Sequence, residues 1–354
     1  MKLYRRIYYF SMGKIKLVYA KFDHVWIRVI AGAPFGPTVY YALFNRSFRR
    51  EQKANILARI EYEKALEKPS SGCVLLRRNI HRLEKGLTMK DRRPVFAKNY
   101  IEETVAAFCE YKKLFSGDID ADEEYQWFRD VLGEYFGATG EDAIIAEASK
   151  NYHSSLKGEK IGNVTPFIRD FDVPLNCSYE DLLQLVVRRR SVRWFLDRKV
   201  ERELLEKALF IGLYAPSACN RQPFEFRIFD DPDEATEVAQ LAMGVAGYEK
   251  QIPCTIVVIG KLDAYFSERD RHVIYIDASL AIMGFMMALE SLGLSSCAIN
   301  WPDIDSNEKA MKEMLSLDPW ERPIMQIAVG YPDQSIAVPR SVKKTVKDVI
   351  KWGK

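Results

Sequence analysis

The 354-residue sequence predicts an α+β fold for its second half and a mainly helical fold for its first half. From about residue 178 onward, helical and strand-like segments alternate, which is typical of helices packed on a sheet. From 49 to 106 the pattern is helical, with few β-branched runs. A looser stretch over 158–174, with one glycine and two prolines after Gly158, separates the two halves. We therefore expect a basic, aromatic arm (1–50), a helical extension (51–175) and an α+β domain (176–354).

The elements of the second half follow from its apolar runs and turn signals. Helices are expected over 179–190, 200–213, 234–247, 273–292 and 306–315, and strands over 225–229, 254–260, 296–299 and 324–330. The segment 273–292 is nearly all apolar, and a helix that is hydrophobic all round must be covered on every side. A second subunit is the expected cover, so the sequence predicts a homodimer.

The N-terminal arm combines cations with aromatic rings. Residues 1–50 hold ten Lys and Arg, one acid (Asp23) and twelve aromatic residues. This mixture suits a membrane surface, where cations meet anionic lipids and rings lie at headgroup depth. The alternative is an arm packed on the rest of the protein with its cations in solvent. Nucleic-acid binding is not expected.

Targeting and spanning segments are not predicted for the arm. No clean apolar core of a secretory signal follows its basic start. Arg28, Pro34 and Pro37 interrupt the best candidate span, 25–44. The six cysteines form no CxxC pair and only four histidines are present, so no metal site is predicted and reduced thiols are expected. These features favour a cytoplasmic protein, with peripheral contact at the inner face of the membrane as an option.

One helix of the extension has a polar cluster beside its apolar stripe. Leu76, Ile80, Leu83 and Leu87 recur at helical spacing within 75–87, and Gly86 is the expected helix stop.

His81, Glu84 and Lys85 gather at one flank of that stripe. His81 and Lys85 are candidate contacts for an anionic substrate. The alternative interpretation is a salt-bridged helix face.

A dense basic cluster follows the first expected helix of the α+β domain. It reads Arg188-Arg189-Arg190-Ser191-Val192-Arg193 and leads into Trp194-Phe195. Guanidinium groups offer fork-shaped donors that match phosphate oxygens, so the cluster is a candidate anion site. A solvated helix end is the alternative.

A second motif, Ala215-Pro216-Ser217-Ala218-Cys219-Asn220-Arg221-Gln222-Pro223-Phe224, lies between a helix and a strand. Its prolines rigidify the loop, and the amides of Asn220 and Gln222 can pair with the edge of a heterocycle.

Two further motifs lie near the C-terminus. Residues 293–301 (Gly-Leu-Ser-Ser-Cys-Ala-Ile-Asn-Trp) end the apolar helix and begin a strand. Gly330-Tyr331-Pro332 follows the last strand, and a second basic cluster begins at Arg340. This cluster suits the same phosphate as the first.

In this order the four motifs resemble those of the nitroreductase family of FMN-dependent flavoproteins, over roughly 180–354. The family opens with an Arg-Arg-Ser-x-Arg-x-Phe type motif, here Arg189 to Phe195. It continues with Ala-Pro-Ser-x-x-Asn-x-Gln-Pro-aromatic, here Ala215 to Phe224. A long apolar helix ending in Leu-Gly-Leu (292–294) follows, and Gly-Tyr-Pro with a basic tail closes the pattern.

The resemblance implies a dimeric fold with a mixed sheet flanked by helices, and FMN as cofactor. Arg189, Arg190, Ser191 and Arg193 would hold the FMN phosphate and ribityl chain, completed by Arg340 and Lys343. Pro216, Ser217 and Ala218 would line the flavin bound mainly by the other subunit. Asn220 and Gln222 would lie close to the ring or brace the loop. No catalytic side chain is assigned.

Asn300 and Trp301 depart from the family pattern. Many members have Gly-Gly or Glu-Gly beside the reactive flavin edge, where this chain has Asn300-Trp301. A Trp there would narrow the pocket or stack near the substrate, which argues against broad nitroaromatic reduction. Cys219 replaces a common Ser or Thr and is interpreted as packing, because no His is near it in sequence.

The expected function is therefore an FMN-dependent oxidoreductase. Hydride would pass from NAD(P)H through flavin N5 to a small-molecule acceptor. The extension is similar to that of long nitroreductase-like proteins associated with cell-surface polysaccharide genes, which favours a sugar-linked or polar acceptor. Two alternatives stay open: a flavin enzyme for one specific metabolite that hardly uses NAD(P)H, and a non-catalytic membrane-surface partner protein with a vestigial flavin site.

Overall fold

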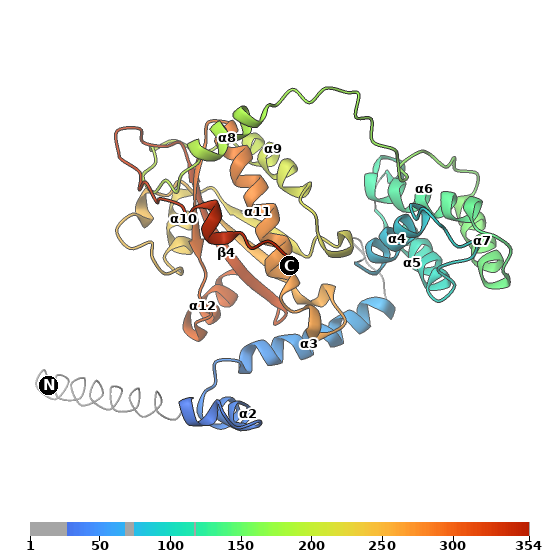
Figure 1. Cartoon of the computed structure of the whole chain (residues 1–354), viewed down its shortest axis with the longest axis horizontal. Coiled ribbons are helices and arrows are strands. Elements are labelled where there is room, and N and C mark those ends of the chain that lie inside the picture. The colour runs from blue at the N-terminus through green and yellow to red at the C-terminus, as the bar shows by residue number, and fades with distance from the viewer. Residues whose placement is uncertain (1–26, 68–73, 117, 354) are drawn as a thin grey trace, which may run out of the picture. The chain divides into compact units, whose positions relative to one another are not determined.

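The computed structural model describes residues 27–67, 74–116 and 118–353 (Figure 1). The chain divides into two compact units, 1–54 and 55–354. The first half of the basic arm, 1–26, lies outside the described residues. Its second half forms α2 (Gly36–Val39) and a π-helical turn (Tyr40–Phe44).

The extension is helical, as predicted. After α3 (Arg49–Glu67) come α4 (Val74–Leu87), α5 (Ile101–Leu114), α6 (Glu123–Ala138) and α7 (Ala143–Leu156). The helices α4 to α7 enclose a core rich in aromatic rings, among them Phe108, Tyr125, Phe128, Tyr135 and Tyr152, all fully buried.

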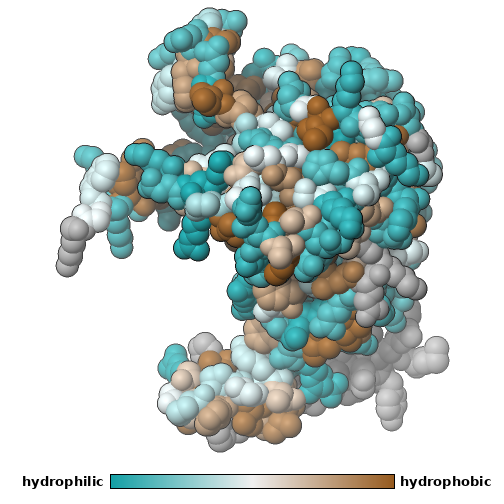
Figure 2. All heavy atoms as spheres, turned by 90° about the vertical axis from the view of Figure 1, so that its right-hand side faces the viewer, coloured by the Kyte–Doolittle hydropathy of each residue, from teal (hydrophilic) through white to brown (hydrophobic). Residues whose placement is uncertain are grey.

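Hydrophilic side chains cover most of the surface in the space-filling view, and hydrophobic ones lie in separate groups (Figure 2).

The apolar stripe predicted for α4 is confirmed, but the role expected of Gly86 is wrong. Leu76, Ile80 and Leu83 are fully buried. Gly86 lies inside α4, and its φ is not in the left-handed region that a helix-ending glycine adopts. A Cβ atom there would lie 2.2 Å from Cε2 of Phe96. Glycine at position 86 therefore provides space for the Phe96 ring.

Replacing Gly86 with alanine is expected to lower the free energy of unfolding by about 1–3 kcal/mol, because the added methyl overlaps the Phe96 ring. Gly137 in α6 is the matched control, since a Cβ there meets nothing within 4 Å. Gly137→Ala should gain up to about 1 kcal/mol from helix propensity. Urea unfolding followed by circular dichroism measures both, and equal effects of the two changes would contradict this role for Gly86.

Residues 158–178 connect α7 to α8 without a helix or strand, in keeping with the looser stretch in the sequence. The buried carboxylate of Asp130 anchors the start of this connection. It accepts hydrogen bonds from the backbone amides of Gly162 (2.9 Å) and Val164 (3.0 Å), and it pairs with Arg129 at 2.8 Å.

The second half forms an α+β domain, as predicted. Its strands are β1 (Phe224–Phe229), β2 (Cys254–Lys261), β3 (Ser295–Asn300) and β4 (Glu321–Gly330). Its helices are α8 (Tyr179–Arg188), α9 (Arg202–Leu213), α10 (Pro232–Ala239), α11 (Val273–Ser291), α12 (Asp305–Leu315) and the short α13 (Val346–Val349). Most bounds agree with the expected ones to within three residues.

The sheet is antiparallel, whereas a mixed sheet was expected. Its order is β1-β2-β4-β3, and each adjacent pair of strands is antiparallel. The crossover through α11 joins β2 to β3, which run parallel to each other but are not neighbours. Because β4 lies between them, the parallel relation produces no parallel ladder.

One helix is shorter than expected. α10 ends at Ala239, whereas the apolar pattern predicted a helix to 247. Gly244 and Gly247 lie in the non-helical segment that follows, and their φ angles of 87° and 97° are left-handed and incompatible with a helix there.

The long apolar helix α11 packs one face on the domain and exposes another. Gly212 of α9 allows close packing, since a Cβ there would lie 2.9 Å from the carbonyl oxygen of Ala281. By contrast, Ile276, Leu280 and Met283 of α11 are 57%, 44% and 45% exposed. By length and composition, 268–291 also resembles a membrane span, but half of that window is buried in the protein, as in a core helix.

Candidate functional site

The basic segment after α8 runs along the edge of the sheet. Ser191 forms a parallel bridge with Ser296 of β3, and Phe195 forms an antiparallel bridge with Pro332. The amide of Val192 donates to the carbonyl of Ser296 at 3.2 Å. The fold therefore brings the first predicted motif against the start of β3 and against the Gly-Tyr-Pro motif, about 140 residues later in the sequence.

The consecutive arginines have different partners. Arg188 Nε forms an ion pair with Glu290 of α11 at 3.0 Å. Arg190 Nη1 donates to the carbonyl oxygen of Arg189 at 3.0 Å. The Nε of Arg189 is buried and has no hydrogen-bond partner among the described residues. Because a buried donor without a partner is costly, Arg189 is the arginine of this run that is best placed to take an external anion.

A second unsatisfied group lies on the neighbouring strand. Ser296 Oγ is also buried without a partner in the described part of the chain. Next to it, burial raises the pKa of the Cys297 thiol, and the positive charges of Arg193 and Arg189 oppose that rise. Two arginines and Ser296 therefore cluster at the start of β3.

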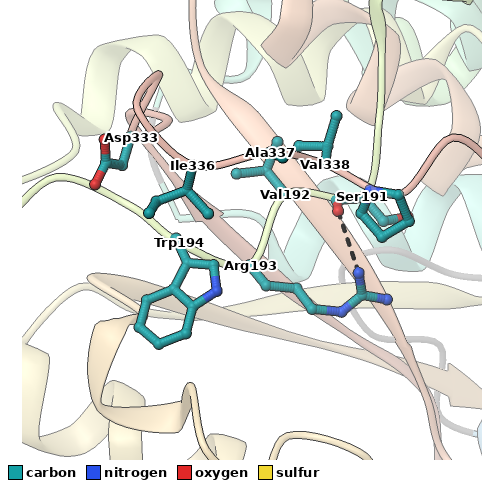
Figure 3. A pocket seen from close by; sticks show the side chains of 9 residues that line it. Ser191, Val192, Arg193, Trp194, Asp333, Ile336, Ala337 and Val338 are labelled. Atoms are coloured by element: carbon teal, nitrogen blue, oxygen red, sulfur yellow. Dashed lines mark hydrogen bonds between the residues drawn. The ribbon is translucent and has the colours of Figure 1, made fainter.

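A small pocket of about 160 Å³ opens beside this cluster. Ser191, Arg193 and Trp194 line one side, and Asp333 with 336–339 line the other (Figure 3). The guanidinium of Arg193 turns back toward the carbonyl of Ser191, at 3.4 Å. Pockets for drug-sized ligands measure roughly 300–1,000 Å³, so this one suits one end of a larger ligand.

The loop 215–223 is held in an unusual conformation. Cys219, Asn220 and Gln222 have φ angles of 55°, 51° and 49°, all left-handed. Ser217 Oγ accepts from the amide of Gln222 at 3.2 Å, and the side chains of Gln222 and Asn220 join at 3.3 Å. Non-glycine residues keep such angles where their surroundings impose them, commonly at ligand sites.

Asp277 of α11 anchors this loop from the domain core. Its Oδ2 accepts from the amide of Ala218 at 2.9 Å and from the hydroxyl of Tyr265 at 3.4 Å. Burial raises the pKa of Asp277, while these donors and Arg221 oppose the rise. Arg221 is itself 7% exposed and stacks over the Tyr265 ring at 4.8 Å.

The extension reaches the same loop through Arg77. Arg77 Nε donates to the carbonyl oxygen of Asn220 at 2.9 Å. His81, one turn along α4, lies 3.1 Å from Glu84, which is the arrangement of the salt-bridged alternative. Lys85 is exposed. A substrate contact for His81 and Lys85 stays a prediction.

Asn300 and Trp301 lie at the end of β3. Asn300 is exposed, opposite Met325 of β4. The Trp301 ring is 8% exposed, packs in the domain core, and donates from Nε1 to Glu308 at 2.8 Å. In this protomer the indole therefore fills the core rather than projecting into an open pocket.

The remaining predicted residues lie on exposed chain. Pro216 is exposed at the entry to the loop. Arg340 and Lys343 are exposed in the C-terminal segment, and Pro339, directly before Arg340, lines the pocket. The structure thus joins the basic segment and the tail at one pocket. Loop 215–223 bonds to α4 through Asn220 and to α11 through Ala218.

Sequence reasoning missed three residues of this region. The sequence does contain a signal for Asp277, because an acid inside an apolar helix requires buried hydrogen-bond donors. Ser296 and Arg77 had none, since their importance depends on neighbours distant in sequence. Among the described residues, no group of His, Cys, Asp or Glu could hold a metal ion.

The donor set fits a phosphate-bearing ligand such as FMN. Arg189 Nε and Ser296 Oγ offer buried hydrogen-bond donors, Arg193 adds positive charge, and the adjacent pocket has room for one end of the molecule. Its small volume leaves the rest of the ligand to be covered by other surfaces.

A family model and several known proteins are similar to part of this chain. Residues 186–251 and 250–331 match the model of the nitroreductase family. A protein of Archaeoglobus fulgidus with the provisional name NADH dehydrogenase/NAD(P)H nitroreductase is 25% identical over 154 residues, 43% of this chain and 86% of that protein. The FMN reductase (NAD(P)H) of Bacillus subtilis is 24% identical over 182 residues, 47% of this chain and 72% of that protein. Among solved structures, an FMN-dependent nitroreductase from Clostridium difficile is 27% identical with a TM-score of 0.39, covering 47% of this chain and 93% of its own.

The family match spans the basic segment, the left-handed loop and the four strands that the structure describes, and it ends at Tyr331 of the Gly-Tyr-Pro motif. These are the same motifs that suggested the family in the sequence, now joined by the fold. The C-terminal part of this chain therefore matches the nitroreductase family over 186–331, and a helical extension precedes that match.

Proposed function

We propose that the protein is an FMN-dependent oxidoreductase that uses NAD(P)H as electron donor and a small molecule as acceptor. The observation that supports it best is the pair of buried, unsatisfied donors, Arg189 Nε and Ser296 Oγ, beside a pocket between the basic segment and the tail. The flavin, when bound, supplies the redox chemistry.

In this proposal the chain's own residues bind and orient the FMN. Arg189, Ser191 and Arg193 hold the phosphate, and Arg340 and Lys343 approach it from the tail. A guanidinium in a largely buried site makes a stronger charge-assisted bond than one in solvent. The names of the relatives from Archaeoglobus fulgidus and Bacillus subtilis support NAD(P)H as donor. A polar or sugar-linked acceptor is our preferred class.

A second copy of the chain completes the site in this proposal. Its support is the exposed apolar surface on neighbouring helices of the domain. The exposed residues are Leu182, Leu183, Val186 and Val187 of α8, Phe210, Ile211 and Leu213 of α9, and Ile276, Leu280 and Met283 of α11. Water contact at so many large apolar side chains is unfavourable, so burial in a homodimer is expected. Pro216, Ser217 and Ala218 of one protomer would then line the flavin held by the other.

The cellular setting belongs to the same proposal. A cytoplasmic enzyme fits the reduced thiols expected from the sequence. Peripheral contact of the arm with anionic lipid would place the enzyme at the inner face of the membrane. Co-sedimentation with anionic vesicles measures that contact.

The test is the visible spectrum of the purified protein, with Arg189→Ala beside it. We expect flavin bands near one FMN per protomer, and an affinity reduced at least about tenfold in Arg189→Ala, since a charge-assisted hydrogen bond is lost. Arg202→Ala is the control, because Arg202 is an exposed arginine paired with Asp230 at 2.7 Å. It should bind FMN normally.

Two outcomes would contradict the proposal. A protein that stays colourless after incubation with FMN would favour the non-catalytic partner protein. Bound FMN that NAD(P)H does not reduce would favour the metabolite-specific flavin enzyme. Oxidation of NAD(P)H, followed with and without candidate acceptors, separates the second outcome from the expected one.

A further inference from the structure

The N-terminal extension touches the loop that the proposed function places against the flavin. The contact is Arg77 Nε, which donates to the carbonyl oxygen of Asn220 at 2.9 Å. Asn220 lies between Cys219 and Gln222, the other residues of the loop with left-handed φ angles. Arg77 thus binds the loop at its most constrained point.

Arg77 is fixed on the extension side as well. Its guanidinium pairs with Glu124 of α6 through Nη1, and their side chains are 17% and 22% exposed. Glu124 also lies within 3.4 Å of the Tyr111 hydroxyl, from α5. Arg77 further lies over the Trp127 ring, 5.5 Å from its centroid. Three helices of the extension therefore determine where this guanidinium lies.

The loop has a second anchor within the domain. Asp277 holds the amide of Ala218, two residues before Asn220. One side of the loop is thus fixed by a buried carboxylate of α11, and the other by a guanidinium of α4. A conformation with three left-handed non-glycine residues persists where the surroundings over-determine it, and these two anchors do so.

Further contacts hold the extension against the same region of the domain. Arg78 lies over the Phe266 ring at 5.9 Å, and Tyr62 of α3 approaches that ring at 6.3 Å. Arg59 of α3 pairs with Glu268 at 2.9 Å. Phe266 directly follows Tyr265, the partner of Asp277. The extension therefore supports the loop and the segment behind it.

We propose that Arg77 is a positioning residue, through which the N-terminal extension sets the geometry of the flavin loop 217–222. This inference rests on the proposed function and assigns a task to the extension: it holds the loop in a binding-competent form. Without Arg77 the loop samples other conformations. The affinity for FMN then falls in proportion to the fraction of molecules whose loop keeps the binding-competent conformation.

The experiment compares Arg77→Ala with Arg82→Ala in the full-length protein. Arg82 is the matched control, because it lies on the same helix, stacks on Tyr100 at 3.6 Å and bonds Asn79 at 3.2 Å, both inside the extension. The readouts are the Kd for FMN from quenching of flavin fluorescence, the visible circular dichroism of the bound flavin, and Tm.

We expect Arg77→Ala to raise the Kd for FMN about tenfold and to change the visible dichroism, since a charge-assisted hydrogen bond is lost at the loop. Arg82→Ala should change the Kd less than about twofold, even with a similar drop in Tm. Arg77→Lys keeps the charge near Glu124 but lacks the guanidinium fork, and we expect an intermediate Kd.

Equal Kd values for Arg77→Ala and wild type, with unchanged dichroism, would overturn the inference while leaving the proposed function intact. Equal losses of FMN affinity in Arg77→Ala and Arg82→Ala would also overturn it, because they would indicate general destabilisation. Should Arg77→Ala fail to fold, Arg77→Lys against Arg82→Lys decides in the same way. A wild-type protein that binds no FMN would refute the proposed function itself.

Discussion

Replacing Asp277 with alanine is expected to lower the free energy of unfolding by about 3–5 kcal/mol and to abolish measurable FMN binding. The change leaves two donors without their acceptor, the amide of Ala218 and the hydroxyl of Tyr265, and it removes the negative charge near the buried Arg221. The loop that includes Ala218 then loses its anchor on α11. Urea unfolding and an FMN titration measure the two effects.

Asp277→Asn is the matched control for that prediction. The amide oxygen can still accept from Ala218, so both losses should be smaller. If the alanine and asparagine variants behave alike, or if alanine costs less than about 1 kcal/mol, Asp277 does not anchor the loop as described.

We also expect the stability difference between wild type and Asp277→Asn to depend on pH. Because burial raises the pKa of Asp277, the folded protein holds this proton at a higher pH than the unfolded chain, whose ordinary value is 3.8. The resulting stabilisation is complete below the pKa of the unfolded chain, and it is lost as the pH rises through the pKa of Asp277 in the folded protein. The stability of wild type relative to Asp277→Asn should therefore be greatest in acid and decrease as pH rises.

A single charge on α11 is expected to convert the proposed dimer into monomers. Met283 is 45% exposed and lies one turn from Leu280 on the apolar face. In Met283→Glu a carboxylate would be buried between protomers without a partner, which should weaken dimerisation at least about a hundredfold. Sedimentation velocity over a concentration series measures the change. Flavin content should fall with it, if each site is shared between protomers.

Leu114→Glu provides the control for surface charge. Leu114 is 55% exposed at the end of α5, which is not one of the helices of the proposed interface (α8, α9 and α11). We expect it to leave the association state unchanged. A wild-type protein that sediments as a monomer at all concentrations would refute the dimer, and a dimer unaffected by Met283→Glu would move the interface elsewhere.

Local signals in the sequence were sufficient for most elements. The stripe of Leu76, Ile80 and Leu83 follows from helical periodicity alone, and the structure buries all three. The strands were recognisable as apolar runs bounded by turns. Such features depend on residues within one or two turns of each other, and a single sequence contains that information.

The arrangement of the elements depends on distant contacts, which the sequence does not display. Nothing near β2 indicates that β4 will separate it from β3, and the mixed sheet that the family resemblance implied is wrong. Gly86 looked like a helix end because its neighbour in space, Phe96, lies outside the helix. For the same reason the motifs identified Asn220, while its partner Arg77, 143 residues earlier, had no visible signal.

The position of β4 also affects the order in which parts of the protein can fold during synthesis. The core of the extension lies before residue 157 and is complete while the C-terminal half is still being made. β2 and β3 must wait for residues 321–330, the last strand to emerge, before either gains its central neighbour. During that interval the inner edge of β2 carries unpaired backbone groups, the kind of edge on which nascent chains aggregate. We therefore expect closure of the sheet to be a late and slow step in folding.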